Sequence, residues 1–285
     1  MVRLAENSYG KSDVRLTKVV RSGETHTLQE LVVRIMLGGP FDRVYTQGDN
    51  SLCIPTDTMK NTVYALARKS NFNSPEAFAE ILAKHFLRFD QVEWAEVSIE
   101  QEPWARIEVD RSPHPHSFTR SGSGTRVCQL KLERGGAAWA HGGIKGLEVI
   151  KTTQSVFEGF FKDSYTTLAE AQDRIFATRI DATWQYTSGS EPLPEVFETA
   201  RRTLLETFAR HNSASVQQTI FAMGEELLSR LPQITAVSLT MPNQHRLLVN
   251  LGPFGMDNPN EIFVATSEPY GLIKGTVARD GKWEG

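Results

Sequence analysis

The sequence predicts an α+β protein, in which an antiparallel sheet is covered on one face by a pair of helices. Segments in which apolar and polar residues alternate flank two consecutive helical segments, and this order occurs twice. The regular strand–helix alternation of a doubly wound parallel sheet is absent. A sheet covered on only one face must hide the other face, which favours barrel-like oligomerisation over a monomer.

The composition describes an ordinary globular chain. It has 285 residues, of which 40% are hydrophobic and 23% are charged, enough for one large domain or two smaller ones. A net charge of −3 gives no basic field to attract nucleic acid or an anionic membrane. Two cysteines exclude a disulfide framework, and no apolar stretch approaches the ~20 residues of a membrane span. We therefore expect neither a nucleic-acid nor a membrane partner.

The first half begins with an antiparallel hairpin. Apolar residues alternate with polar ones over 14–20 and 31–37, and Ser22-Gly23-Glu24 lies between these segments. Helical spacing follows from Asp57 to Ser70, and a second helix begins at Ser74-Pro75-Glu76, which offers a cap residue and a proline in the first turn. Strand-like residues return over 92–99 and 107–109.

The second half repeats this order after the flexible break Ser121-Gly122-Ser123-Gly124. We therefore predict two units, residues 1–122 and 123–285. The predicted elements are strands over 128–132, 147–150 and 180–186, helices over 196–208 and 216–227, and strands over 237–241 and 247–251. The last two strands are expected to form a hairpin around Pro242-Asn243-Gln244-His245.

Candidate binding residues lie where helices begin. Thr56-Asp57 opens one helix, and Ser215-Val216-Gln217 opens another. The N–H groups and the positive dipole end of a helix start can bind an anion or the polar edge of a heterocycle. Taken locally, however, Asp57 and Ser213 or Ser215 are most simply helix caps.

Other candidates have simple structural explanations when they are taken one at a time. Arg174 is most simply half of a buried ion pair with Asp173 or Asp181. His114-Pro115-His116 has metal-like spacing, but no third ligand stands at a recognisable spacing, which favours turn histidines that hydrogen-bond to the backbone. The local interpretations of the rest are a surface charge for Lys11, a core side chain for Phe157, and turn residues for Asn243 and His245. No phosphate-binding loop, dinucleotide fingerprint, hydrolase elbow or zinc-protease motif is present.

Taken together, these same residues resemble the uricase (urate oxidase) family. The resemblance spans almost the whole chain in the right order, and an ordered set is specific even though each piece is short. The matching segments are Tyr9-Gly10-Lys11, Asp49-Asn50-Ser51, Thr56-Asp57, Lys60-Asn61-Thr62, 114–118, 147–152, Gly159-Phe160, 165–168, Asp173-Arg174-Ile175, 181–184, 212–217, 242–245 and 270–274. Residues 253–261 resemble the bacterial branch of the family.

The resemblance implies a fold and an assembly. Each chain would consist of two tandem tunnelling-fold units, each an antiparallel sheet with a helix pair, in agreement with the repeated order above. Chains would pair to close a barrel, and two pairs would stack into a homotetramer with active sites between chains. A cytoplasmic enzyme is implied, because the tail Gly281-Lys282-Trp283-Glu284-Gly285 is not a Ser-Lys-Leu peroxisomal signal.

The resemblance also implies a reaction, in which urate, dioxygen and water give 5-hydroxyisourate and hydrogen peroxide without a metal or an organic cofactor. Arg174 would clamp one edge of urate and Gln217 the opposite edge, while Phe157 would stack under the ring. Backbone N–H groups of Val216 and of Asp57, the latter from a neighbouring chain, would complete the rim of the site.

Three side chains would move protons and a fourth would hold oxygen. Lys11 and Thr56, the latter from a partner chain, would form a proton-relay pair that His245 extends. Asn243 would lie above the ring, where dioxygen and then water must be held. Urate would be the electron donor, and the protein would keep it flat and stabilise the developing charge.

Two other functions are open on the sequence. A purine-binding module without catalysis on the same fold would be marked by loss of Lys11 or Thr56, and both residues are present. A tunnelling-fold enzyme that processes pterins or nucleotides would use a metal at His114 and His116. Metal analysis, together with activity after chelation, separates that enzyme from a uricase.

Overall fold

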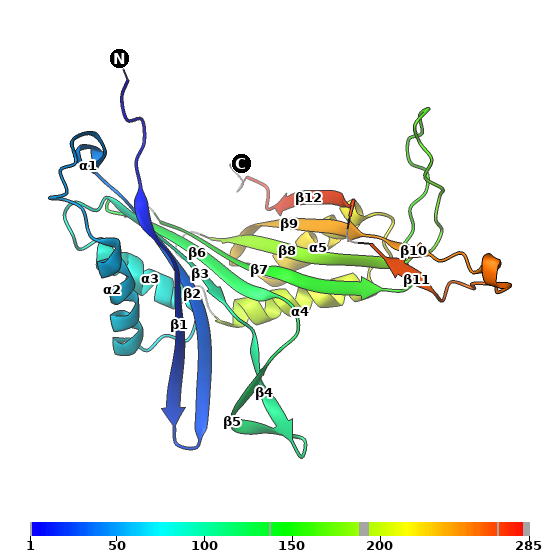
Figure 1. Ribbon diagram of the computed structural model, residues 1–285, viewed down its shortest axis with the longest axis horizontal. Helices are drawn as coiled ribbons and strands as arrows, with labels where there is room; N and C mark the ends of the chain where they lie inside the picture. Colours follow the sequence, from blue (N-terminus) through cyan, green and yellow to red (C-terminus); the bar gives the residue numbers. More distant parts are fainter. Residues whose placement is uncertain (1, 137, 188–193, 267, 282–285) are drawn as a thin grey trace. The chain divides into compact units, whose positions relative to one another are not determined.

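The structure is a computed structural model, and its helices and strands confirm the α+β class (Figure 1). It describes residues 2–136, 138–187, 194–266 and 268–281. Contacts divide the chain into two compact units: unit 1 is Met1–Gly143 with Gln185–Phe197, and unit 2 is Ile144–Trp184 with Glu198–Gly285. None of the helices in the described ranges is long and apolar enough to cross a membrane. The tail residues 282–285, on which the argument about a peroxisomal signal depends, lie outside the described residues.

Unit 1 begins with the predicted hairpin. Strand β1 (Tyr9–Ser22) pairs antiparallel with β2 (Thr25–Gly38), and the register is closed by Ser22 opposite Thr25. Gly23 has a φ of +60°, the left-handed conformation that a two-residue hairpin loop requires and that glycine adopts without strain. The hairpin predicted from the alternating pattern is therefore confirmed.

Two helices cover one face of the sheet in unit 1. After the short helix α1 (Asp42–Gln47), α2 (Thr56–Lys69) lies against β1, and α3 (Pro75–Phe86) lies against β3 (Trp94–Gln101). The hydroxyl of Ser74 caps α3, accepting from Ala77 N at 3.1 Å, as the sequence predicted. The largest fully buried side chains of this core are Leu31, Ile35, Leu37, Phe41, Met59, Phe78, Leu82, Phe86 and Ile99.

Strand β6 (Thr125–Glu133) does not lie where the sequence predicted. The sequence interpretation took it as the first strand of the second repeat, but it pairs antiparallel with β3 inside unit 1. The Gly-Ser break at 121–124 instead follows a separate ribbon, β4 (Trp104–Val109) and β5 (Ser112–Arg120), which is inserted between β3 and β6 (Figure 1). In chain order, each repeat has two strands, two consecutive helices and two strands, once this ribbon, the short α1 and the short elements over 246–265 are left aside. The division after Gly122 stays a prediction.

Unit 2 contains most of the elements of the second repeat. Its elements are most of β7 (Ala138–Lys151), β8 (Phe176–Tyr186) and α4 (Pro194–Arg210), then α5 (Val216–Arg230), β9 (Ile234–Gln244) and β12 (Gly271–Ala278). Helix α5 lies against β9 and β12. Gly224 permits this close packing, because a Cβ there would come within 2.4 Å of Val277 Cγ2.

The hairpin predicted around Pro242-Asn243-Gln244-His245 is wrong. Pro242 and Asn243 continue β9 and pair with β12, where Asn243 lies opposite Gly271. The residues that follow form the short strand β10 (Arg246–Leu248), which pairs with β11 (Phe263–Ala265) across a segment that includes the 3-10 helix η1 (Gly252–Phe254). An alternating pattern identifies a strand but not its partner, and the true partners lie farther along the chain.

Candidate active site

Unit 2 places Arg174 beside the ring of Phe157. The guanidinium carbon lies 5.2 Å from the ring centroid. Phe157 is fixed by two backbone hydrogen bonds with Ala171, of 2.7 and 3.0 Å, and its ring stacks on that of Phe160 at 5.0 Å. Because Phe157 is only half-buried, it is a partly exposed aromatic surface next to a cation. The core position inferred from its local sequence is wrong.

Arg174 has no carboxylate partner among the described residues, so the expected buried ion pair is also wrong. Asp173 accepts from Thr153 Oγ1 at 2.8 Å, and Asp181 accepts from Gly146 N at 2.7 Å. Arg174 is half-buried, its buried Nε has no hydrogen-bond acceptor, and desolvation lowers the pKa of the guanidinium. A desolvated cation with unused donors is suited to bind a ligand oxygen or an anion.

The start of α5 offers further donors in the same unit. Ser215 caps this helix, since its hydroxyl accepts from Gln218 N at 3.1 Å. A helix leaves its first N–H groups without an intrahelical acceptor, and in the ranges that the structure covers no acceptor faces those of Val216 and Gln217. The side chain of Gln217 is exposed. This helix start therefore presents free N–H groups and the positive end of a dipole to a ligand.

Backbone contacts bring these residues into one place. Residues Ser155 and Ser213 form a parallel bridge, in which Val156 N donates to Ser213 O at 2.8 Å and Ser213 N donates to Gln154 O at 3.0 Å. The segment that carries Phe157 is thereby joined to the segment that leads into α5. We call Phe157, Arg174, Val216 and Gln217 the clamp group.

Asn243 lies near the C-terminal end of β9, and His245 directly follows that strand. Asn243 belongs to the strand, and the backbone oxygen of His245 accepts from Thr266 N at 3.1 Å. Among the described residues, no hydrogen bond, ion pair or ring contact joins either side chain to the clamp group. The places of Asn243 and His245 in the site therefore stay predictions.

Unit 1 places Lys11 beside the start of α2. Lys11 is half-buried in β1, directly before an irregularity in the pairing with β2, and is not the freely solvated charge expected from its local sequence. The pKa of Asp57 is lowered, chiefly because Lys60 donates to its carboxylate, and Lys11 adds a smaller attraction. Lys11 and the Thr56–Asp57 helix start are therefore neighbours in one unit of one chain. We call Lys11, Thr56 and Asp57 the relay group.

Asp57 is not the cap of its helix, which corrects the local interpretation. It lies in the first turn of α2, where its carboxylate accepts from Lys60 and, at 2.9 Å, from Asn61 Nδ2. The residue at the cap position is Pro55, which provides no side-chain hydrogen bond. The first N–H groups of α2, which include that of Asp57, thus have no cap from a side chain.

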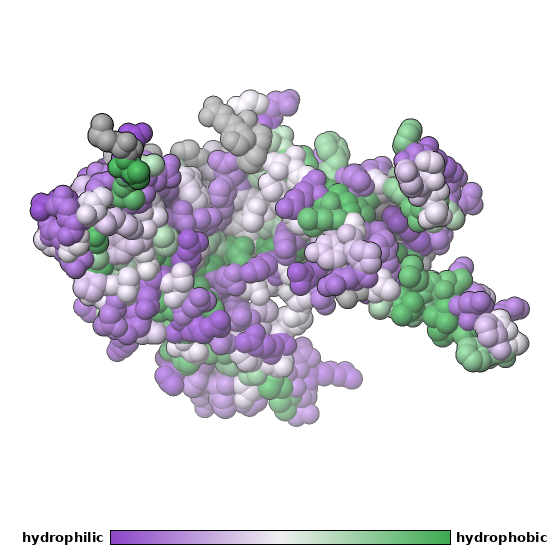
Figure 2. Space-filling view, turned by 45° about the horizontal axis from the view of Figure 1, so that its top comes forward, coloured by the Kyte–Doolittle hydropathy of each residue, from purple (hydrophilic) through white to green (hydrophobic). Residues whose placement is uncertain are grey.

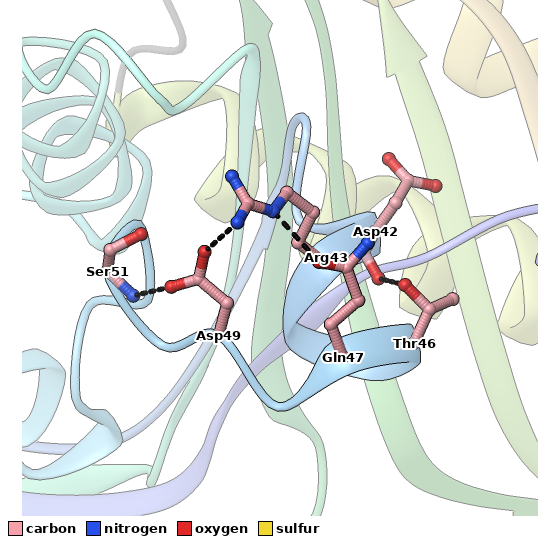
Figure 3. Close-up of polar contacts among 6 residues, drawn as sticks. All are labelled: Asp42, Arg43, Thr46, Gln47, Asp49 and Ser51. Atoms are coloured by element: carbon pink, nitrogen blue, oxygen red, sulfur yellow. Dashed lines mark hydrogen bonds and ion pairs between the residues drawn. The ribbon is translucent and has the colours of Figure 1, made fainter.

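Surface contacts shape the loop that leads into α2. Arg43 pairs with Asp49 at 2.8 Å, and Asp49 also accepts from Ser51 N at 3.1 Å (Figure 3). The Ser51 bond is the main cause of the lowered pKa of Asp49. Nearer to the helix, Ile54 N donates to the hydroxyl of Tyr9 at 2.7 Å, two residues before Lys11 along β1. These contacts brace the loop that leads into α2, and the Tyr9 bond ties it to β1.

The histidine pair lies in a strand, so the predicted turn is wrong. His114 and His116 belong to β5, and their rings are 4.5 Å apart with an edge-to-face geometry. Arg106 donates to the backbone oxygens of His114 and of Pro115. Within the described ranges, no three histidine, cysteine, aspartate or glutamate side chains are grouped so that they could hold a metal.

Some residues that support the two groups were not predicted from the sequence. Tyr9 and Ser155 were not considered as site residues, and Ser213 was considered only as a helix cap. Thr219 follows Ser215 by four residues, a spacing that places both on one side of a helix start. That spacing was the available signal, whereas no local pattern identified Tyr9.

The fold and the candidate site define a two-repeat α+β protein in which a half-buried cation lies beside an aromatic ring. A sequence profile of the uricase family matches residues 7–131 and 140–274. The chain is 42% identical over 281 residues to a uricase of Arthrobacter globiformis, covering 98% of this chain and 91% of that protein. It is 39% identical over 288 residues to a uricase of Aspergillus flavus, covering 95% of each.

Solved structures give the same result. The crystal structure of uricase from Arthrobacter globiformis superposes with a TM-score of 0.95 at 42% identity, covering 100% of this chain and 98% of that one. Urate oxidase from Bacillus sp. TB-90 superposes with a TM-score of 0.81 at 25% identity, covering 96% of this chain and 100% of that one. The chain therefore belongs to the uricase family, as its motifs predicted.

Proposed function

We propose that this chain oxidises urate with dioxygen and water to 5-hydroxyisourate and hydrogen peroxide, at a site where the relay group of one chain meets the clamp group of another. One observation carries the proposal: the half-buried guanidinium of Arg174 lies beside the Phe157 ring, with no carboxylate partner among the described residues. Urate is flat, anionic near neutral pH and rich in carbonyl oxygens, so it fits a cation beside an aromatic face.

The clamp group binds urate by its edges and by one face. The planar fork of Arg174 donates to a carbonyl oxygen and a ring nitrogen, and the amide of Gln217 pairs with the opposite edge. The free N–H of Val216 adds a donor from the positive end of α5. The ring of Phe157 supports the purine by dispersion and offset stacking.

The relay group deprotonates the bound ring. Lys11 and Thr56 pass a proton away from urate, His245 extends the path, and the N–H of Asp57 holds the rim. Asn243 holds dioxygen over the ring. Urate supplies both electrons that reduce dioxygen, a hydroperoxide forms at C5, and water then displaces hydrogen peroxide to leave a hydroxyl at that carbon. The sequence led us to expect Thr56 from a partner chain. Because Lys11 lies near the start of α2 in its own chain, our proposal is instead that one chain supplies the entire relay group.

A homotetramer is the assembly that we propose for this site. Unit 2 exposes many large apolar side chains, and Figure 2 shows apolar atoms gathered on the projecting segment at its right, which carries η1. Those with exposed fractions of 48–72% on β10, β11 and the segment between them are Leu247, Leu248, Phe254, Met256, Ile262 and Val264. Apolar surface of this kind suits burial between chains.

We also propose that the protein is located in the cytoplasm. Fractionation of cells that express it tests this location.

Urate turnover by purified, chelator-treated protein tests the reaction. We expect urate to disappear and hydrogen peroxide to accumulate in equal amounts, with dioxygen consumption to match. A folded, oligomeric sample that consumes no urate contradicts the proposal. Activity that disappears with the metal and returns when metal is added favours the metal-dependent enzyme at His114 and His116 instead.

Serial dilution tests the interchain site. If the relay and clamp groups come from different chains, specific activity should fall as the oligomer dissociates, in step with the mass measured by sedimentation. Constant specific activity across the transition to a monomer would show that a single chain contains a complete site.

A further inference from the structure

Ser213 is attached to both parts of the clamp group. Its backbone pairs with Gln154 and Val156, in the segment that continues to the aromatic ring. Its side chain points into the first turn of α5, where Oγ lies 3.0 Å from Ser215 O and 2.8 Å from Thr219 Oγ1. One residue therefore connects the aromatic side of the clamp to the helix start.

The hydroxyl groups of Ser213 and Thr219 are fully buried, so water cannot replace either of them. Thr219 Oγ1 also lies 3.1 Å from Ser215 O. Two hydroxyl protons serve the three contacts, so one hydroxyl donates to the other while the second donates to Ser215 O. Removing both hydroxyl groups leaves the turn before Val216 without these side-chain bonds.

Movement of this turn would also move Gln217 relative to Arg174. Arg174 is fixed to the same bridge from the other side, since its backbone N donates to Ser155 O at 2.9 Å. On the basis of the proposed function, we propose that Ser213 and Thr219 are positioning residues, which set the separation of Arg174 and Gln217 to the width of a purine ring.

Substitutions that separate the hydroxyl from the methyl group of Thr219 test this role. Thr219→Val keeps the shape and removes the hydroxyl, whereas Thr219→Ser keeps the hydroxyl. We expect Thr219→Val to raise both KM for urate and the inhibition constant of xanthine about threefold, as the loss of one hydrogen bond would. Ser213→Ala combined with Thr219→Val should raise both constants about tenfold or more, as the loss of two hydrogen bonds would. In all variants kcat should change less than KM, and Thr219→Ser should retain the wild-type KM.

The exposed hydroxyl pair Ser238–Thr276 provides a matched control in the same unit, because its oxygens are also 2.8 Å apart. Thr276→Val should leave KM and the xanthine constant unchanged. The inference is overturned if the double variant binds urate and xanthine as the wild type does, or if Thr219→Ser raises KM as much as Thr219→Val. A wild-type protein that neither turns over nor binds urate overturns the proposed function itself, which distinguishes the two failures.

Discussion

The relay group and the clamp group are held by different kinds of contact. In unit 1, the loop that leads to Thr56 is braced at the surface by Arg43 and Asp49, whose side chains are 66% and 28% exposed. In unit 2, the clamp is joined by the fully buried hydroxyl groups of Ser213 and Thr219. Exposed ion pairs contribute little, whereas buried polar groups must keep their partners.

The two helix starts differ in the same way. Helix α5 has a side-chain cap from Ser215, while the cap position of α2 is occupied by Pro55, which provides none. A rigid ligand needs a clamp of fixed width, but a proton relay reaches its working geometry only once the substrate is in place. We infer that the clamp is pre-formed and that the relay is the more adaptable part.

Lys11→Met should have the largest effect, since it removes the proposed proton acceptor from the relay. We expect kcat to fall about 1,000-fold, within the usual range for a lost general acid–base group, while KM changes little. Steady-state kinetics with urate measure both quantities, with Lys84→Met on the exposed side of α3 as the control. A variant with wild-type kcat would remove Lys11 from the relay.

Arg174→Ala should have the second largest effect and should act on binding. Loss of a charge-assisted, bidentate contact is expected to raise KM and the xanthine inhibition constant about 100-fold, with a smaller loss in kcat. Direct calorimetry of xanthine binding gives the affinity without turnover. Arg210→Ala, at the exposed end of α4, is the control, and equal affinities for the two variants would contradict the clamp.

Acidification should destabilise both units by a moderate amount. Desolvation lowers the pKa of His85 and His141 in unit 1 and of His211 in unit 2, below the value of 6.5 for a free side chain. The unfolded chain therefore binds protons that the folded chain does not, and stability falls as the pH decreases through 6.5.

We expect the melting temperature to drop by a few degrees between pH 7.5 and 5.5, and scanning calorimetry measures the drop. His141→Gln should reduce this pH dependence through unit 1, and His211→Gln should reduce it through unit 2. A melting temperature that rises on acidification would contradict the direction of all three shifts.

Arg43→Met should have the smallest effect, because it removes an exposed ion pair. We expect kcat and KM to stay within about twofold of the wild type. Stopped-flow and steady-state assays on matched samples detect larger changes. A tenfold loss of kcat would mean that the surface brace positions Thr56 as firmly as the buried hydroxyl pair positions the clamp, and the contrast between the units would disappear.

Much of the fold followed from periodicity. The hairpin of β1 and β2 and the capped helix α3 were predicted from local patterns, because each is determined by residues close in sequence. The pairing of β9 with β12 was missed, since strand pairing depends on residues that alternation does not identify. Strand β6 was assigned to the second repeat because the Gly-Ser segment after the β4–β5 ribbon resembles a linker, whereas β6 pairs with β3.

The candidate site could be predicted only in part. The ordered motifs identified Arg174 and Lys11 as site residues. Taken one at a time, however, they were interpreted as half of an ion pair and as a surface charge. Among the described residues Arg174 has no carboxylate partner because Asp173 and Asp181 bind other groups, and no sequence pattern reveals those bonds. The role of Ser213 likewise depends on a bridge between segments almost sixty residues apart.

The guanidinium of Arg174 affects the stability of the protein without its ligand. A partly dehydrated cation that has no carboxylate partner in the described part of the chain costs the folded protein free energy, and a purine anion bound as proposed would offset that cost. If Arg174 binds the ligand as proposed, an apolar residue at this position should raise the melting temperature of the ligand-free protein and abolish the extra thermal stability that a bound purine provides.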